Sequence, residues 1–121
     1  METTKITEGN KLIAEFMAVI NNFSDYYYMP QFGHYFNSYG NIEFNETFRS
    51  DELKYHTSWG WLMPVVEKIE NLYDGDVLVE ISDEICYIGY GSFYQNTATA
   101  ETKIKAVYGA VVEFIKWYNQ K

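Results

Sequence analysis

Apolar residues recur at helical spacing near the start of the chain. Between about residues 4 and 23, large apolar side chains follow three- and four-residue steps at Ile13, Phe16, Met17, Ile20 and Phe23. The hydroxyl of Thr4 or Thr7 is suited to cap the start, and Asn21, Asn22 and Ser24 are turn-forming residues suited to end it. The pattern therefore predicts a first helix over about 4–23.

A second helical pattern occupies the middle of the chain. One stripe is formed by Tyr55, Trp59, Leu62, Val66, Ile69 and Tyr73. Pro64 is harmless in a first turn but kinks a helix when it lies further inside, because its ring removes a backbone hydrogen bond. We expect a helix from about 58 to 73 that is kinked or starts late.

Strict alternation replaces the helical spacing after the turn signal Asp74-Gly75-Asp76. Val77, Val79 and Ile81 share one face of the segment 77–82, and the apolar segment 85–90 follows after two acidic residues. This spacing predicts an antiparallel hairpin over about 77–90. Gly89 and Gly91 suggest a bulge or a close backbone approach near its end.

The last helical pattern is the clearest. Its stripe consists of Ile104, Val107 or Tyr108, Val111, Ile115 and Tyr118, widened by Ala106, Ala110, Phe114 and Trp117. We predict a helix over about 98–119, with Thr97 or Thr99 as its cap. Glu101 in the first turn and Lys116 in the last would both favour the helix dipole.

In residues 24–50, neither the helical spacing nor the alternation of a strand continues over more than a few residues. Met29-Pro30, Gly33 and Gly40-Asn41 are turn signals, whereas Ile42-Glu43-Phe44 alternates and predicts a short strand. An irregular loop of this length is unusual in a compact domain, so some strand pairing is expected. The order of elements predicts an α+β fold, with three helices packed on a small antiparallel β-sheet, in a single domain over 1–121.

Composition adds the cellular setting. The chain has 121 residues, of which 47% are hydrophobic, and no apolar run approaches a membrane span of about 18 residues. The N-terminus METTKITEGN lacks the order of a signal peptide, and the lone Cys86 fits a reducing compartment. We therefore expect a cytoplasmic protein.

The charge balance is strongly acidic. Seventeen acidic residues stand against nine basic ones, which gives a net charge of −8. Nucleic-acid binding normally requires a basic stripe, and the sequence has none, so no direct nucleic-acid contact is expected. A positively charged protein partner would instead be attracted.

The residue types that carry catalysis do not converge in the sequence. His34 and His56 are 22 residues apart, whereas a zinc site needs three or four ligands. Cys86 lies in a predicted strand with no base beside it, and Ser58 lacks the glycines of a nucleophile elbow. We expect no catalytic residue, no metal and no cofactor.

An acidic segment, residues 67–84, is one of two candidate binding features. It contains the carboxylates Glu67, Glu70, Asp74, Asp76, Glu80, Asp83 and Glu84 against a single Lys68. Such a segment is either a solubilising surface or a docking surface for a basic partner. The second interpretation makes these seven residues candidate partner contacts.

The second feature is a segment rich in aromatic rings, DYYYMPQFGHYFNSYGN at 25–41. Tyrosine is enriched in binding loops because it offers a large contact area at low entropic cost. We expect the phenylalanines to pack beneath the segment and some tyrosines to stay exposed. The candidate contacts are Tyr26, Tyr27, Tyr28, Tyr35 and Tyr39. Stacking on single-stranded nucleic acid is a further interpretation, opposed by the absence of any cation in 25–48.

Three strings, NKLIAEFM at 10–17, LKYHTSWGWLMPVVEKIE at 53–70 and KIKAVYGAVVEFIKWYN at 103–119, resemble those of a family of small proteins from phages and bacterial mobile elements. Gly60 departs from the family, in which this position is often an aspartate. The resemblance implies a bacterial host cytosol and no enzymatic residue. Small acidic proteins in that setting often inhibit host defence, as anti-CRISPR proteins do.

The expected function is thus a non-enzymatic acidic binding protein that inhibits a host defence enzyme. Its partner would be the basic surface of an RNA-guided CRISPR effector nuclease. Two alternatives stay open. One is a phage accessory protein that acts as a dimer or with a replication partner, and the other is a domain that binds single-stranded nucleic acid or a small ligand.

Overall fold

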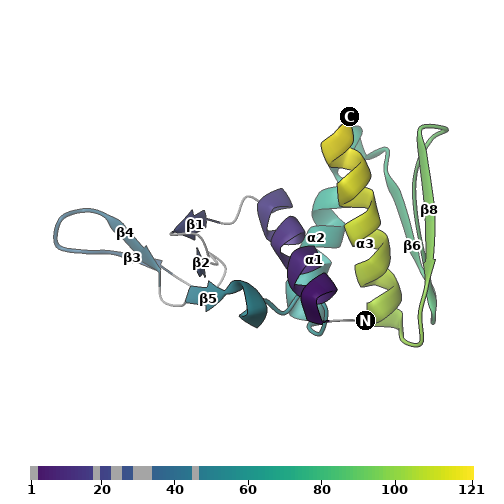
Figure 1. Cartoon of the computed structure of the whole chain (residues 1–121). Helices are drawn as coiled ribbons and strands as arrows, with labels where there is room; N and C mark the ends of the chain where they lie inside the picture. Colours follow the sequence, from purple (N-terminus) through teal and green to yellow (C-terminus); the bar gives the residue numbers. More distant parts are fainter. Residues whose placement is uncertain (1–2, 18–19, 23–25, 29–33, 45–46) are drawn as a thin grey trace. The chain divides into compact units, whose positions relative to one another are not determined.

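The computed structural model describes residues 3–17, 20–22, 26–28, 34–44 and 47–121. The chain forms two compact units, Met1–Leu53 and Lys54–Lys121, which we call the first and the second unit and describe one at a time. The described residues form three α-helices and antiparallel sheets, so the α+β prediction is confirmed (Figure 1). The single domain over 1–121 stays a prediction.

The second unit is built on a three-stranded antiparallel sheet in the order β6-β7-β8. Its strands are β6 (Leu78–Ile81), β7 (Ile85–Tyr90) and β8 (Tyr94–Thr99). Val79 pairs with Ile88, which in turn pairs with Asn96. The predicted hairpin is confirmed, since β6 and β7 are its two strands.

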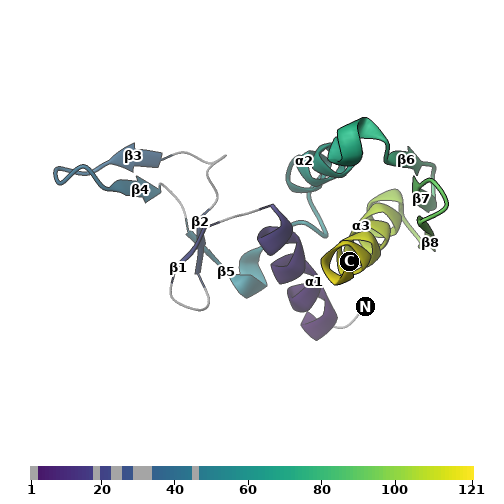
Figure 2. The ribbon, with the colours of Figure 1, turned by 90° about the horizontal axis from the view of Figure 1, so that it is seen from above.

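Two helices, α2 (Trp59–Glu70) and α3 (Lys103–Gln120), lie on one face of this sheet (Figures 1 and 2). α3 packs on β7 and β8, while α2 packs on α3 and β6. The buried side chains of α3 are Ala106, Val107, Tyr108, Ala110, Val111, Phe114 and Ile115. These are mostly the predicted stripe positions, and each large one contributes about 1.5–3 kcal/mol of gross hydrophobic stabilisation.

Small residues bring α3 close to β8. A Cβ built on Gly109 of α3 would lie 3.7 Å from the Cβ of Ala98, an ordinary van der Waals contact. The Asn96 side-chain amide donates a hydrogen bond to the Ala110 carbonyl at 3.2 Å. Apart from Tyr94, which packs on Phe114, the inward side chains of β8 are short or polar, so the strand has few of the large apolar residues by which strands are recognised in a sequence.

The predicted start of the last helix is wrong. The segment from Tyr94 to Thr99 is β8, and α3 begins only at Lys103. Its cap is Thr102, whose side-chain oxygen accepts a hydrogen bond from the Lys105 N–H, so neither Thr97 nor Thr99 caps it. Glu101 precedes the helix and Lys116 lies outside its last turn, so neither occupies the predicted dipole position.

The middle helix is shorter than predicted. α2 ends at Glu70 and is followed by the short 3-10 segment η3 (Leu72–Gly75), so Tyr73 lies outside the α-helix. Pro64 lies inside α2, where it cannot donate a hydrogen bond to the carbonyl four residues earlier. Tyr55 is buried although it precedes the helix.

The first helix is also shorter than predicted. α1 spans Thr3–Phe16, so Thr4 and Thr7 lie within it and do not cap it. Ile20–Asn22 forms β1, which pairs with β2 (Tyr26–Tyr28). The prediction of helix to residue 23 is therefore wrong, because Ile20 continues the helical spacing yet belongs to a strand that pairs further along the chain.

Strands account for much of the segment 24–50. β2 is the central strand of a three-stranded antiparallel sheet that β5 (Thr47–Arg49) completes. The predicted strand at Ile42–Phe44 is confirmed as β4. The turn signals Met29-Pro30 and Gly33 lie outside the described residues.

A buried hydrogen bond joins α1 to the end of the first unit. The buried Asn10 donates its side-chain N–H to the Leu53 carbonyl at 2.9 Å. Leu53 directly follows η2 (Ser50–Glu52), which packs on α1.

Within the described ranges, no helix combines the length and the apolar character that crossing a membrane requires.

Candidate functional site

A two-stranded hairpin in the first unit presents part of the ring-rich segment. It consists of β3 (His34–Phe36) and β4 (Ile42–Phe44). The Asn37 side-chain oxygen accepts hydrogen bonds from the N–H groups of Tyr39, at 2.9 Å, and of Asn41, at 3.0 Å. Gly40 adopts the left-handed conformation with φ +80° that this turn requires. The turn is thus an Asx-type structure set by its own sequence.

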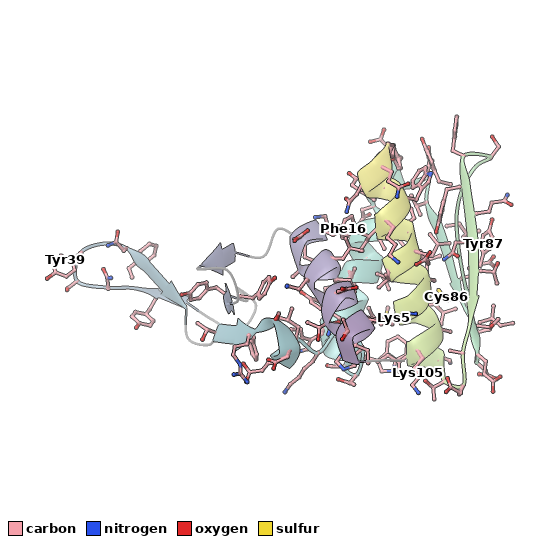
Figure 3. All side chains as sticks on the ribbon, viewed as in Figure 1. Lys5, Phe16, Tyr39, Cys86, Tyr87 and Lys105 are labelled. Carbon is pink, nitrogen blue, oxygen red and sulfur yellow. The ribbon has the colours of Figure 1, made fainter. Side chains whose placement is uncertain are left out.

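Three large rings of this hairpin are exposed. The relative exposure is 53% for Tyr35, 65% for Phe36 and 88% for Tyr39, which lies at the tip (Figure 3). Tyr35 and Phe36 are consecutive in β3 and point to opposite faces of the hairpin, so it exposes a ring on each face and a third at its tip. Exposed rings are typical of binding sites. The exposure of Tyr35 and Tyr39 was expected from the sequence, but Phe36 contradicts the expectation that the phenylalanines pack beneath the segment.

The other candidate tyrosines do not form part of this surface. Tyr27 is only 2% exposed, so its role as a contact residue is excluded; it belongs to the central strand, opposite Asn21 and Phe48. Tyr28 is half-buried. Tyr26 lies on β2, and its side chain is outside those described. Alternation along β2 hides a residue that sequence proximity grouped with exposed ones.

All seven carboxylates of the acidic segment are exposed. Glu67 and Glu70 lie on α2, Asp74 and Asp76 lie in and after η3, Glu80 lies on β6, and Asp83 and Glu84 lie in the β6–β7 turn. Within the part of the chain that the structure describes, Asp83 is the one member in an ion pair, with Lys103 at 3.9 Å.

The acidic segment divides into two groups along the second unit. The strand β6 separates Asp76 from Asp83, and at about 3.3 Å per residue this places them about 20 Å apart. Glu67, Glu70, Asp74 and Asp76 form the first group, which we call the α2-η3 acids. The carboxylates are therefore spread over α2, η3, β6 and the β6–β7 turn, and Glu80 shares the face of β6 that carries the exposed Leu78.

A cluster of half-buried rings in the second unit was missed from the sequence. Tyr73 stacks on Tyr90 with ring centroids 4.1 Å apart and an interplanar angle of 14°. Trp117 lies 6.5 Å from Tyr90, and Tyr118 meets Tyr73 edge-on at 6.4 Å. Tyr73 and Tyr118 were expected to be positions of apolar helical stripes, and the structure leaves both rings partly exposed. We call Tyr73, Tyr90, Trp117 and Tyr118 the ring cluster.

The backbone that carries Tyr73 is strained. Tyr73 has φ 52° and ψ 44°, and Asp74 has φ 60° and ψ 31°. Both lie in the left-handed region, which is unfavourable for residues with a Cβ and unusual for an aromatic one. Such strain persists only where surrounding contacts hold it, and it is often found at functional sites.

The sheet face opposite the helices carries exposed apolar residues. Leu78 is 54% and Ile85 is 45% exposed. Tyr87 lies on this face, whereas Cys86, the residue before it in β7, is buried (Figure 3). A Cβ built on Gly89 would approach the Tyr87 Cζ to 2.8 Å, so the ring covers the glycine. Strand pairing continues through Gly89 without a bulge, and the group that lies over it is a side chain, so the bulge or close backbone approach predicted from Gly89 is not found there.

Two shallow grooves border the second unit. One, of about 330 Å³, is lined by Tyr94, Gln95, Asn96, Glu113, Lys116, Trp117 and Gln120. The other, of about 480 Å³, is lined by Ser82, Asp83, Glu84, Ile85 and Thr99. Neither resembles the deep apolar pocket with convergent polar groups that characterises small-molecule sites.

Burial shifts the pKa of three titratable groups of the second unit toward their neutral forms. Burial raises the pKa of the Cys86 thiol to about 11 and that of the Tyr94 hydroxyl to about 12, with Glu113 adding to the latter. Burial lowers the pKa of His56, whose ring meets Tyr108 edge-on at 6.1 Å. A nucleophilic thiol needs the opposite shift. No group of three His, Cys, Asp or Glu side chains in the described ranges could hold a metal ion.

Comparison with models of protein families, with curated proteins and with solved structures returned no match in any of the three. The exposed rings, the acidic surface and the ring cluster are therefore the observations from which a function is inferred.

Proposed function

We propose that this protein is a non-enzymatic binding protein that docks on a positively charged surface of a macromolecular partner. The observation that carries the proposal is the exposure of all seven carboxylates in 67–84, on a chain of net charge −8. A surface of one sign accelerates the encounter with a partner of the opposite sign.

The hairpin supplies a second element of the proposed surface. An isolated two-stranded hairpin is marginally stable in water, and exposed rings at its end gain contact area when they are covered. Tyr35, Phe36 and Tyr39 would therefore act as anchors that add affinity to the electrostatic attraction. Truncating an anchor residue of this kind typically costs about 1–3 kcal/mol of binding.

The specific form of the proposal is inhibition of an RNA-guided nuclease, which the resemblance to mobile-element proteins suggests. The channel for the guide–target duplex in such enzymes is strongly positive and accepts a polyanion. An acidic protein could occupy it without any chemical step. The test is a DNA-cleavage assay with a guide-loaded nuclease, titrated with this protein at several salt concentrations.

We expect cleavage to fall as the protein is added, and the inhibition to weaken as salt rises, because salt screens the attraction. The double variant Glu67→Gln/Glu70→Gln should inhibit less. The matched control is Glu8→Gln/Glu15→Gln, which removes the same charge from exposed positions of α1. Full cleavage at saturating protein rejects the proposal for that enzyme, and equal loss in both variants rejects the role of the acidic surface.

A second candidate function is self-association of a mobile-element accessory protein. The exposed Leu78 and Ile85 on the open face of the sheet favour it, as does the edge position of β8. Light scattering distinguishes the two. A stable dimer that the substitution Ile85→Lys dissociates, together with no effect on the nuclease, would support self-association over inhibition.

A further inference from the structure

Three rings of the second unit lie close to a cation. The Lys121 Nζ lies 4.3 Å from the centroid of the Tyr73 ring, and at 5.5 Å and 5.6 Å from the centroids of the Trp117 and Tyr118 rings. The same ammonium donates a hydrogen bond to the Tyr73 hydroxyl. An ammonium within about 6 Å of a ring face is attracted by the ring quadrupole. The ammonium therefore lies at the hydroxyl edge of Tyr73 and within reach of the Trp117 and Tyr118 rings, and we call these three residues the aromatic cage.

The cage is assembled from separate parts of the second unit. Trp117 and Tyr118 belong to the last turn of α3, while Tyr73 comes from η3. Tyr73 is held by the strained left-handed turn and by its stack on Tyr90 of β7. The two consecutive left-handed residues, Tyr73 and Asp74, set the position from which this ring projects.

The cage lies next to negative charge. Asp74 follows Tyr73 directly, and Asp76 and Glu70 are each three residues from Tyr73 along the chain. All three carboxylates are exposed. Carboxylates beside an aromatic cage attract cations from solution, and the rings then select a cationic side chain with an apolar stem over a small hydrated ion.

We propose that Tyr73, Trp117 and Tyr118 form a binding site for a lysine or arginine side chain of a basic protein partner. In the free protein the site is occupied by Lys121, which the partner's side chain displaces. This rests on the proposed function, because it assigns the α2-η3 acids and the cage as the place where the positively charged partner is held.

Lys121 acts as an internal competitor in this arrangement. Its side chain is exposed and follows the end of α3, so it can leave the cage without unfolding the helix. A cation–π contact at an exposed site is worth a factor of about three to five in affinity. Removing the Lys121 charge should therefore tighten the binding of an external cation by about three- to fivefold.

The test uses a small probe, so that it does not depend on identifying the partner. Nα-acetyl-lysine N-methylamide is titrated into the wild-type protein and into Lys121→Gln, and the ring resonances of Tyr73 and Trp117 are followed by NMR. The neutral norleucine analogue of the probe shows how much of the shift requires the charge. We expect lysine-probe binding to be tighter in Lys121→Gln, with no shift of these rings by the norleucine probe.

The matched control is Lys116→Gln, which removes a lysine that lies on α3 and pairs with Glu113 at 3.1 Å, outside the cage. It should leave probe binding unchanged. Adding Tyr118→Leu or Tyr73→Leu to Lys121→Gln should abolish the gain. The two ring variants lie on different elements, η3 and α3, so if one fails to fold the other still gives the test. Equal probe affinity in Lys121→Gln and Lys116→Gln, or equal shifts with both probes, overturns the proposal.

The two proposals fail separately. If the lysine probe binds the cage as expected but no basic macromolecule binds the protein, the cage is supported as a cation-binding site and the proposed function is rejected. If the nuclease is inhibited in a salt-dependent way but the probe shifts none of the cage rings, the proposed function stands and the cage is rejected as its contact site.

Discussion

The strained turn before β6 gives a test in which one substitution should have opposite effects at two neighbouring positions. Asp74 has φ 60° and ψ 31°, whereas Asp76 has φ −83° and ψ 0°. Both are exposed aspartates of the same acidic segment. Replacement by glycine removes the same charge and the same side chain from each, so the difference between the two variants reports the backbone conformation.

The expected magnitude follows from two opposing terms. The left-handed conformation costs an L-residue about 1–2 kcal/mol relative to glycine. Glycine loses about 0.5–1 kcal/mol more conformational entropy on folding than a residue with a side chain. Asp74→Gly should therefore stabilise the protein by about 0.5–1 kcal/mol, while Asp76→Gly, with no strain to relieve, should destabilise it by a similar amount.

Urea unfolding of the two variants and the wild type measures these effects. A difference of about 1–2 kcal/mol between the variants corresponds to midpoints that differ by about 0.5–1 M urea, at the slopes usual for a chain of this size. The Asp76→Gly variant keeps the hydrogen bond from its backbone N–H to the Tyr73 carbonyl, 3.2 Å in length. Midpoints that move in the same direction by the same amount would refute the assignment of strain to this turn.

Three further outcomes follow from single residues. Gly91→Ala should destabilise the protein by about 1 kcal/mol in the same urea assay. Gly91 has φ +54° in the β7–β8 turn and open space for a Cβ, so the cost comes from the left-handed backbone conformation alone and not from a steric clash. Burial holds the pKa of His56 below 6.5, so the imidazole binds a proton more tightly in the unfolded chain than in the folded one. The contribution of neutral His56 to the free energy of unfolding is therefore complete above about pH 6.5, and it is lost as the pH falls through the lowered pKa. His56→Gln should flatten that part of a stability-against-pH curve, and an unchanged slope would contradict it. The raised pKa of buried Cys86, about 11, predicts that iodoacetamide at pH 8 alkylates the thiol far more slowly in the folded protein than in urea, and equal rates would show that the side chain is accessible.

The elements with strong periodicity could be predicted from the sequence. The stripes of α2 and α3 and the alternation of β6 and β7 each follow from large apolar side chains that face one core. β8 could not be recognised, because its inward residues after Tyr94 are Asn96 and Ala98, which are polar or small where a strand is usually marked by large apolar residues. Because the strand was not recognised, Thr97 and Thr99 of β8 were predicted to cap the following helix.

Long-range pairing explains the other errors in the fold. Ile20 continues the spacing of α1, but Ile20–Asn22 pairs with Tyr26–Tyr28, a contact that a helical period cannot reveal. Pairing on both edges also buries Tyr27, which looks equivalent to its neighbours in the sequence. Local patterns report local structure, whereas burial depends on the partner strands.

The candidate site was predictable in its charges and in the exposure of Tyr35 and Tyr39. The exposure of the seven carboxylates agrees with their polar sequence context. The cage was not predictable, because it needs Tyr73 from a strained turn to meet Trp117 and Tyr118 from another element. Their spacing in the sequence indicated helix faces, and the left-handed backbone at Tyr73 has no sequence signal.

The central claim is that exposed carboxylates of the second unit hold a basic macromolecule. Its most direct test is parallel affinity capture from a bacterial lysate with the wild type, Glu67→Gln/Glu70→Gln and the control Glu8→Gln/Glu15→Gln, followed by mass spectrometry at two salt concentrations. We expect the wild type and the control to retain a basic partner at low salt, and we expect the Glu67→Gln/Glu70→Gln variant to lose this partner, as all three proteins should at high salt. A partner that is acidic, or that all three proteins retain equally at both salt concentrations, would contradict it.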